Sequence, residues 1–415
     1  MDEEEVFLLL EGYLRERGFT ETLKSLEKES GRHFKEKEGH QLVLKTGQLQ
    51  EILDDFAHKR RMETEKSLSV DHLFEDGDGS YAGLLWSSLD YLTEGHNVLV
   101  VRLIETGALA VGGSKAMLVS TSIPLPLSLT TPPRSVVSQT HKVCKGAVLC
   151  IDFHPTKRNL VLCGSMDRTA FILNLFKKEE EEEEQEGGVM VQSFTDHTKY
   201  VVRALWSRTG QYFITASYDK TACLYNLQGD LYHKKKVFQF KDPVEAVAVS
   251  KLSDVFVVGI RNDNLLHIID MTLDDPVEVR LINMNAVGDD YVSFNPMHIS
   301  FSPSERHLLI STDKDRLILY DWLSGKLVTN LYGATNDEFS QPRHCWHPNG
   351  QYVYGTSQDK SIVVWELRSQ RIVSKLTGHE GIVRDLHYCN ELDLLVSCGF
   401  DGAVKLWINK RKMEE

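Results

Sequence analysis

The sequence lacks the patterns that mark several large classes of protein. Its 415 residues hold seven scattered cysteines and no CxxC pair, which favours buried, reduced thiols over a zinc ribbon or a disulfide framework. No apolar run approaches the ~18 residues of a membrane span, and the acidic start Met1–Glu5 is the opposite of a basic signal-peptide start. We expect an intracellular protein of the cytoplasm or nucleus, neither secreted nor transmembrane.

Basic charge and catalytic motifs are also scarce. Asp and Glu number 60 against 47 Lys and Arg, a formal charge of −13, so we expect no direct nucleic-acid binding, which needs clustered basic residues. No phosphate-cradling glycine loop, HExxH motif or nucleophile elbow is present. The 16 histidines show no metal-ligand spacing. We therefore expect no cofactor, no metal and no enzyme.

A repeated β-patterned layout occupies the chain after residue 140. Its best copy, residues 378–407, opens with a Gly-His pair, turns at Asp401-Gly402 and ends in an alternating apolar strand closed by Trp407. Weaker copies lie upstream, and the register of the fourth is ambiguous by two residues. The turns recur every 42–52 residues or so, at Asp167, Asp219, Asn262-Asp263, Asp313 or Asp315, Asp359 and Asp401.

This layout resembles a WD repeat, whose unit is one four-stranded blade of a β-propeller. By that resemblance two units carry the hydrogen-bonded set that pins each blade turn, with Tyr225 replacing Trp in one of them: His379, Ser397, Asp401 and Trp407, and His197, Thr215 and Asp219. The same histidines and aspartates could serve as acid–base pairs of an enzyme that uses the propeller channel. The structural interpretation is much stronger, because buried polar groups need such partners.

The resemblance predicts a mainly β fold, a propeller over residues 81–410. A seventh unit opens at Gly95-His96, and its Pro-rich segment, residues 123–133, replaces a regular outer strand. The chain ends just after Trp407, so the last blade has three strands of its own, and residues 84–92 are predicted to supply the fourth. We count seven blades, with six or eight as alternatives. The acidic run 177–188 is interpreted as a solvated loop or, alternatively, a peptide for a basic partner.

Residues 1–66 have helical periodicity instead. Residues 6–31 resemble a LisH motif, through Tyr13-Leu14, the Gly18-Phe19 turn and Glu29, and that resemblance implies a small helical dimer. The seam would be lined by Leu9, Leu10, Tyr13, Leu14, Leu23 and Leu26. A hairpin packed on its own propeller is the alternative. A further helix is predicted over 41–66, followed by a linker over 67–80.

One more segment bears on partners. Trp365-Glu366-Leu367-Arg368 resembles the DWD box with which some WD proteins dock on the adaptor of cullin–RING ubiquitin ligases, although Glu366 replaces the usual Asp. Arg368 would be its exposed anchor. We expect a dimeric, non-catalytic scaffold that recruits protein partners into a complex. The alternatives are a ligase substrate receptor that docks through Trp365, Glu366 and Arg368, and the channel enzyme.

Overall fold

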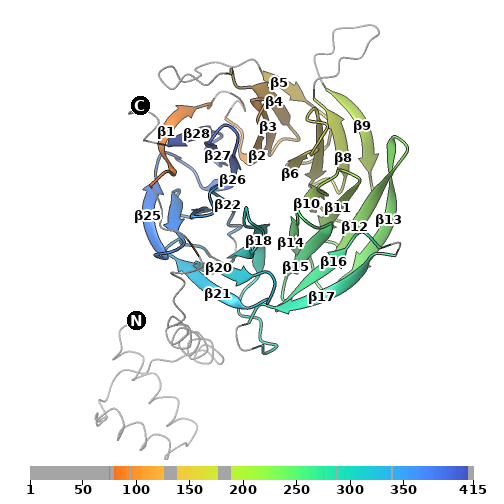
Figure 1. Ribbon diagram of the computed structural model, residues 1–415. Helices are drawn as coiled ribbons and strands as arrows, with labels where there is room; N and C mark the ends of the chain where they lie inside the picture. The colour runs from red at the N-terminus through yellow and green to blue at the C-terminus, as the bar shows by residue number, and fades with distance from the viewer. Residues whose placement is uncertain are drawn as a thin grey trace, which may run out of the picture. The chain divides into compact units, whose positions relative to one another are not determined.

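The computed structural model describes residue 74, residues 79–90, 92, 95–125, 138–175, 188–273, 275–285, 288–337 and 340–409. Within these residues 28 strands form seven four-stranded antiparallel sheets. Figure 1 shows the sheets as seven blades around a central axis. The predicted seven-bladed propeller is thus confirmed. The LisH-like residues, the helix over 41–66, most of the 67–80 linker and residues 177–187 of the acidic run lie outside the described residues.

Each of the first six blades is built from four consecutive strands. The first three blades are β2 (Val98–Leu103), β3 (Ala108–Gly113), β4 (Leu118–Ser122), β5 (Ser138–His141); β6 (Val148–Phe153), β7 (Leu160–Ser165), β8 (Ala170–Asn174), β9 (Val189–Phe194); and β10 (Val201–Trp206), β11 (Tyr212–Ser217), β12 (Thr221–Gln228), β13 (Leu231–Gln239).

The remaining blades continue the order around the ring. They are β14 (Val244–Val249), β15 (Val255–Ile260), β16 (Leu265–Asp270), β17 (Val277–Asn283); β18 (Pro296–Phe301), β19 (His307–Thr312), β20 (Arg316–Asp321), β21 (Leu327–Tyr332); β22 (His344–Trp346), β23 (Tyr352–Thr356), β24 (Ile362–Glu366), β25 (Arg371–Leu376); and β26 (Val383–Cys389), β27 (Leu394–Gly399), β28 (Val404–Asn409) with β1 (Ala82–Ser88).

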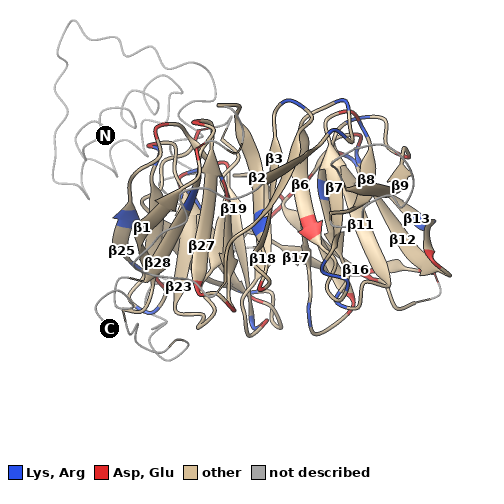
Figure 2. Ribbon diagram, turned by 90° about the horizontal axis from the view of Figure 1, so that it is seen from above, with Lys and Arg blue, Asp and Glu red and all other residues tan. Residues whose placement is uncertain are grey.

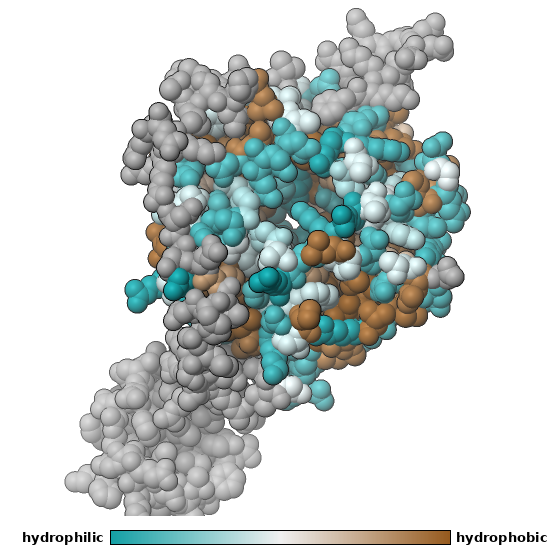
Figure 3. All heavy atoms as spheres, viewed as in Figure 1, coloured by the Kyte–Doolittle hydropathy of each residue, from teal (hydrophilic) through white to brown (hydrophobic). Residues whose placement is uncertain are grey.

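Burial falls from the second strand of each blade to its outermost strand. The second strands β3, β19 and β27 are buried at every position, which explains their continuous apolar sequences. Outer strands are largely exposed, and β17 presents Val277, Val279 and Leu281 at 40%, 50% and 46% exposure. Figure 2 shows most of the charged residues in turns at the two faces, and Figure 3 shows hydrophobic side chains gathered over the region of β14 to β18.

The hydrophobic core is divided among the seams between neighbouring blades. One cluster joins β2 and β3 to β27 and β28, and another joins β15 and β16 to β18, β19 and β20. No blade can bury both of its faces without its neighbours, so stability requires the complete ring. All seven cysteines are free, and five of them are buried.

The turns between second and third strands explain the Asp period in the sequence. In four blades the Asp is followed by a residue with positive φ, namely Arg168, Lys220, Lys360 and Gly402. The Asp then accepts a hydrogen bond from the backbone two residues on, as Asp219 does from Thr221 at 3.0 Å. In the fifth blade Asp313 accepts from the backbone nitrogen and side chain of Asn295 at 2.8 and 2.7 Å. Asp315 of the same turn accepts from the Asn336 nitrogen before the next blade, so both aspartates hold backbone at this turn.

The last blade is completed by β1, which pairs antiparallel with β28 from Ala82↔Asn409 to Ser88↔Lys405. The strand occupies residues 82–88, two residues earlier at its start than the predicted 84–92. It starts earlier because Ala82 is fully buried and its backbone nitrogen donates to the Tyr354 hydroxyl at 2.8 Å. It ends at Ser88, whose hydroxyl donates to Asp90 at 2.5 Å in the following turn.

The prediction that a Pro-rich segment replaces the outer strand of the first blade is wrong. β5 pairs with β4 from Leu118↔His141 to Thr121↔Ser138. The strand has only four residues, Ser-Gln-Thr-His, and all of them are polar, so it lacks the apolar alternation by which strands are recognised. Among the described residues no helix is long and apolar enough to cross a membrane.

Candidate functional site

The best-preserved repeat places its polar set in one line. His379 Nδ1 lies 2.8 Å from Asp401 Oδ2, and His379 Nε2 lies 2.7 Å from Ser397 Oγ. Trp407 Nε1 donates to the same Ser397 oxygen at 2.8 Å. A Trp nitrogen can only donate and a carboxylate can only accept. The hydrogen bonds are therefore donated in sequence from Trp407 to Ser397, from Ser397 to a neutral His379, and from His379 to an ionised Asp401.

The electrostatics agree with this direction. Burial lowers the pKa of His379 in spite of the neighbouring Asp401. Burial alone would raise the pKa of Asp401, but the electrostatic interaction with the His379 ring and hydrogen bonds from His379 and from the backbone of Glu380 and Ala403 outweigh it, so that pKa is lowered. Asp401 also holds the Glu380 nitrogen at 2.9 Å. The set therefore ties the chain before β26 to the turn after β27.

This Ser–His–Asp order matches a hydrolytic triad in geometry but not in access. Ser397 is 0% exposed and Trp407 covers its hydroxyl, so no carbonyl substrate can reach the oxygen. The second set repeats the arrangement: His197 Nε2 lies 2.8 Å from Thr215 Oγ1 and His197 Nδ1 lies 3.0 Å from Asp219. There the Tyr225 hydroxyl donates to Asp196 at 2.8 Å.

Two further histidine sites were missed in the sequence. His141 on β5 contacts Ser120 on β4 at 2.8 Å and accepts from the Gly188 nitrogen at 2.7 Å. His344 on β22 contacts Ser300 and Ser311 of the preceding blade at 2.7 and 2.6 Å. The second site could not be found from spacing, because its members belong to two blades. Among the described residues no group of three or more His, Cys, Asp or Glu is placed to hold a metal.

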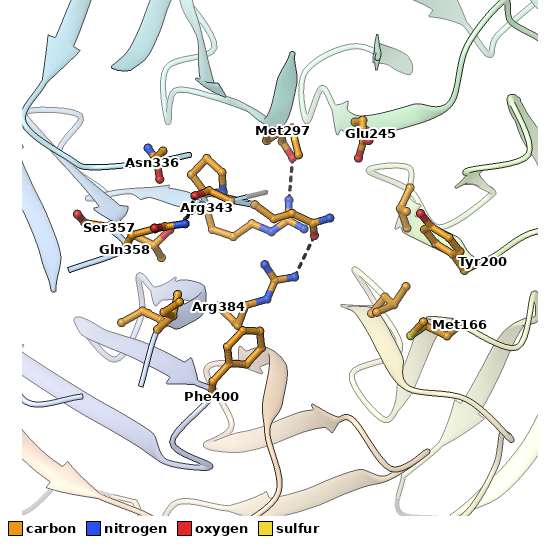
Figure 4. A pocket seen from close by; sticks show the side chains of 18 residues that line it. Met166, Tyr200, Glu245, Met297, Asn336, Arg343, Ser357, Gln358, Arg384 and Phe400 are labelled. Atoms are coloured by element: carbon orange, nitrogen blue, oxygen red, sulfur yellow. Dashed lines mark hydrogen bonds between the residues drawn. The ribbon is translucent and has the colours of Figure 1, made fainter. Parts of the chain in front are cut away.

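The open feature of the propeller is a cavity of about 430 Å³ at the mouth of the central channel. It lies on the face where the chain enters each inner strand, which we call the upper face; the opposite face is the lower face. Figure 4 shows Arg343 and Arg384 extending toward its centre, with Tyr200, Met166 and Phe400 at its border. A concave site with apolar walls and a few polar groups is the usual form of a ligand site.

The channel below the cavity is polar. Arg102 Nη1 donates to Asp385 Oδ2 at 2.5 Å, and Asp385 also accepts from the backbone nitrogen of Val101 at 3.2 Å. Asp152 accepts from the Trp206 nitrogen at 2.8 Å. Burial raises the pKa of Asp152 to about 6, although that hydrogen bond and Arg102 oppose the shift. The Arg102–Asp385 contact joins the first blade to the last, and the Asp152–Trp206 contact joins the second blade to the third.

His154, in the turn after β6, is a buried titratable group. Its Nδ1 accepts from the backbone nitrogens of Lys157 and Thr156 at 3.0 and 3.2 Å, so its folded form is neutral. Burial, and then the charge of Lys157, lowers the pKa of His154 from 6.5 to about 4. The unfolded chain therefore binds more protons between these pH values, and stability falls as the pH drops from about 6.5 to 4.

The variant His154→Asn is expected to reduce this acid sensitivity. An Asn side-chain oxygen can accept the same two hydrogen bonds and does not titrate. We expect near-wild-type stability at pH 8 and a pH-dependent loss smaller by at most about 3 kcal/mol at pH 4. Urea unfolding from pH 4 to 8 measures this, with exposed His233→Asn as the control. An unchanged pH slope in the His154 variant would contradict the assignment.

The DWD-like segment lies on the third strand of the sixth blade. Trp365 is 0% exposed and its Nε1 donates to the Tyr332 carbonyl at 2.8 Å. Glu366 accepts from the Ser369 hydroxyl at 2.5 Å. Arg368 is only partly exposed and interacts with other residues of the chain, and its role as a docking anchor stays a prediction. The side chain lies just beyond the end of β24, on the lower face, because β24 starts at an upper-face turn.

Comparison with known families agrees with this architecture. The WD40 family, described as WD domain, G-beta repeat, matches residues 135–174, 188–226, 327–366 and 370–407. Each matched stretch covers the outer strand of one blade and three strands of the next, for example β25 to β28. Because the sequence repeat is offset from the blade by one strand, the last repeat cannot supply its own outer strand, which β1 provides.

Similar proteins also include WD-repeat proteins. The chain is 21% identical over 268 residues to Pre-mRNA-processing factor 19 of Oryza sativa subsp. japonica, covering 64% of this chain and 39% of that protein. It is 29% identical over 119 residues to DDB1- and CUL4-associated factor 10 of Homo sapiens, covering 28% of this chain and 21% of that protein. An uncharacterised WD repeat-containing protein of Schizosaccharomyces pombe is 26% identical over 251 residues, 53% of this chain and 69% of that protein.

The period of the turns, the buried polar sets, the seven sheets and the family match all describe one architecture. The chain spans well under half of the length of the rice and human relatives. The chain carries WD40 repeats and folds as a seven-bladed WD-repeat β-propeller.

Proposed function

We propose that this chain is a non-catalytic scaffold that recruits protein partners into a multiprotein complex. The observation that supports the proposal is that the triad-like polar sets are inaccessible, whereas surfaces suited to binding are exposed. The hydroxyl and imidazole groups of the two polar sets are buried within blades, whereas the channel mouth is open and the β17 strand exposes Val277, Val279 and Leu281. Exposed apolar side chains on a rigid strand are suited to contact another protein.

The scaffold is proposed to be a dimer through its N-terminal residues. The LisH resemblance of residues 6–31 supports this, although these residues lie outside the described part of the chain. Two short amphipathic helices cannot bury their apolar faces alone. A dimer presents two propellers, and bivalency raises the apparent affinity for a repeated partner without adding any contact.

Full-length protein is expected to sediment as a dimer at micromolar concentration. The double variant Leu9→Lys, Leu14→Lys places charges in the proposed seam and should sediment as a monomer with an unchanged propeller circular dichroism spectrum. Analytical ultracentrifugation is the measurement. The control is Leu252→Lys, Leu323→Lys, at propeller positions that are 70% and 79% exposed, and it should remain dimeric. A monomeric wild-type protein would refute the dimer.

A second candidate function is that of a substrate receptor of a cullin–RING ubiquitin ligase. The human relative is named for its association with DDB1 and CUL4, and the DWD-like residues Trp365, Glu366 and Arg368 lie at or beyond the end of β24. This segment is on the lower face, whereas the channel-mouth cavity is on the upper face. Adaptor and recruited protein could therefore be bound at the same time.

Affinity purification of the full-length protein, followed by identification of the co-purifying subunits, tests both candidates. The scaffold proposal expects a reproducible set of partner proteins. The receptor version expects a cullin–RING adaptor among them and at least tenfold less of it with Arg368→Ala, about the effect of losing one interface arginine. Exposed Arg306→Ala is the control. Equal recovery of the adaptor by Arg368→Ala and wild type would rule out this docking mode.

A further inference from the structure

The channel-mouth cavity contains a half-buried arginine whose hydrogen-bonding capacity is only partly used. Arg384, next to the start of β26, donates from Nη2 to Gln341 Oε1 at 2.9 Å and lies 5.5 Å over the Phe400 ring. Its Nε is buried and has no acceptor among the described residues. Figure 4 shows the guanidinium directed toward the centre of the cavity. A buried donor without an acceptor costs free energy, and a ligand in the cavity could supply that acceptor.

Two more arginines reinforce the positive charge at this place. Arg343 lines the cavity and donates to the Met297 carbonyl at 2.8 Å. Arg203, 7% exposed, donates from Nη1 to the Val202 carbonyl at 3.3 Å, while its Nη2 has no acceptor in the described residues. Burial lowers the pKa of Arg203 to about 10, with opposing effects from Cys150 and Asp385. Arg203 therefore remains charged at neutral pH.

The nearby carboxylates form their ion pairs with other arginines. Asp385 is bound by Arg102 at 2.5 Å, and Glu245 is bound by Arg261 at 3.0 Å. Among the described residues no carboxylate forms an ion pair with Arg203, Arg343 or Arg384. Asp385 attracts Arg203 and Arg384, and Glu245 attracts Arg203, without forming an ion pair with either arginine. A cluster of arginines that is only partly compensated thus lies inside a protein whose formal charge is −13. Low-dielectric walls strengthen the attraction of such a cluster for an anion.

The border of the cavity indicates how the anion is presented. Tyr200 stacks on Tyr218 with ring centres 4.8 Å apart, and Met166 and Phe400 lie on two other blades that border the cavity. These apolar and aromatic walls would contact the hydrocarbon part of a side chain and its flanking backbone. A volume of about 430 Å³ accommodates more than an isolated ion.

We propose that the channel mouth is an oxyanion-binding site that takes a carboxylate or phosphate group carried on a peptide segment of a partner protein. Arg384 is the principal contact, Arg343 the second, and Arg203 supplies charge from the layer below. The inference rests on the proposed scaffold function and names the chemistry by which the upper face recognises its partner. Guanidinium groups bind both oxyanions through paired N–H donors.

The test uses full-length protein and three libraries of fluorescein-labelled short peptides, which share degenerate flanks and carry a central phosphoserine, glutamate or glutamine. By fluorescence anisotropy we expect the phosphoserine or the glutamate library to bind at least about tenfold more tightly than the glutamine library. The tighter of the two identifies the source of the oxyanion. Equal binding of all three libraries would overturn the proposal.

Three variants locate the site. Arg384→Gln should abolish the preference, and Gln341→Glu should do the same by placing an internal carboxylate beside Arg384 while raising the thermal unfolding midpoint. Exposed Arg208→Gln, in the turn after β10 on the lower face, should keep it. A preference that survives both Arg384→Gln and Gln341→Glu, or is lost in Arg208→Gln as well, overturns the assignment.

The two proposals can fail separately. If partner proteins co-purify with full-length protein although no library binds, the scaffold proposal stands and the oxyanion-site proposal fails. If no partner co-purifies and no library binds, both proposals fail.

Discussion

A chain that starts at residue 95, and so lacks β1, is expected to lose the cooperative unfolding of the propeller. The deletion leaves the edge of β28 unpaired, although every residue of that strand is buried in the closed ring. It also removes Trp86 and Leu89 from the cluster that joins the last blade to the first. Burial of two such side chains contributes roughly 2–3 kcal/mol each, and the strand pairing adds to this. The sum approaches the whole stability of an ordinary domain.

A chain that starts at residue 70 is the matched control, because it keeps β1 and removes only the N-terminal residues. It should unfold in one transition at a temperature close to that of the full-length protein. The chain from residue 95 should be aggregated in size-exclusion chromatography, since an unpaired apolar strand edge is a template for association. A monomeric protein with an unchanged unfolding midpoint would show that the ring does not depend on β1.

The sequence predicts this architecture well where the repeat is carried by local chemistry. Asp401-Gly402 and Trp407 mark a turn and a strand end within one repeat, and the spacing of the other turn aspartates extends the pattern around the ring. The count of seven blades followed, as did the need for a strand from before Gly95. These features are visible because each depends on residues a few positions apart in one chain segment.

The candidate site could not be predicted in the same way. Arg203, Arg343 and Arg384 come from three blades and are separated by about 40 to 180 residues in the sequence, so no spacing links them. Their significance also depends on which acids are already paired, as Asp385 is with Arg102. The short polar strand β5 was missed for a different reason, because its pairing is fixed by its neighbour and not by its own composition. Tertiary context decides both cases.

Asp385→Ala is expected to lower the free energy of unfolding by about 3–5 kcal/mol, since it leaves the Arg102 guanidinium without its anion. The Asp385 side chain is 6% exposed, and its carboxylate holds both Arg102 Nη1 and the Val101 nitrogen. These residues belong to β26 and β2, so the contact joins the last blade to the first. Urea unfolding measures the loss. The control Lys375→Ala removes an exposed ion pair with Asp359 and should cost less than about 1 kcal/mol.

The double variant Arg102→Met, Asp385→Leu separates the value of the pair from the cost of a stranded charge. Replacing both partners with apolar groups of similar size removes the buried charge, so much of the stability lost in Asp385→Ala should return. If the free energy of unfolding recovers, the ion pair contributes little net stability, and its main effect is to fix how the first and last blades pack together. If the double variant is instead as unstable as Asp385→Ala, the contact between the first and last blades needs the charges themselves. The ion pair would then help to close the ring together with the β1–β28 pairing.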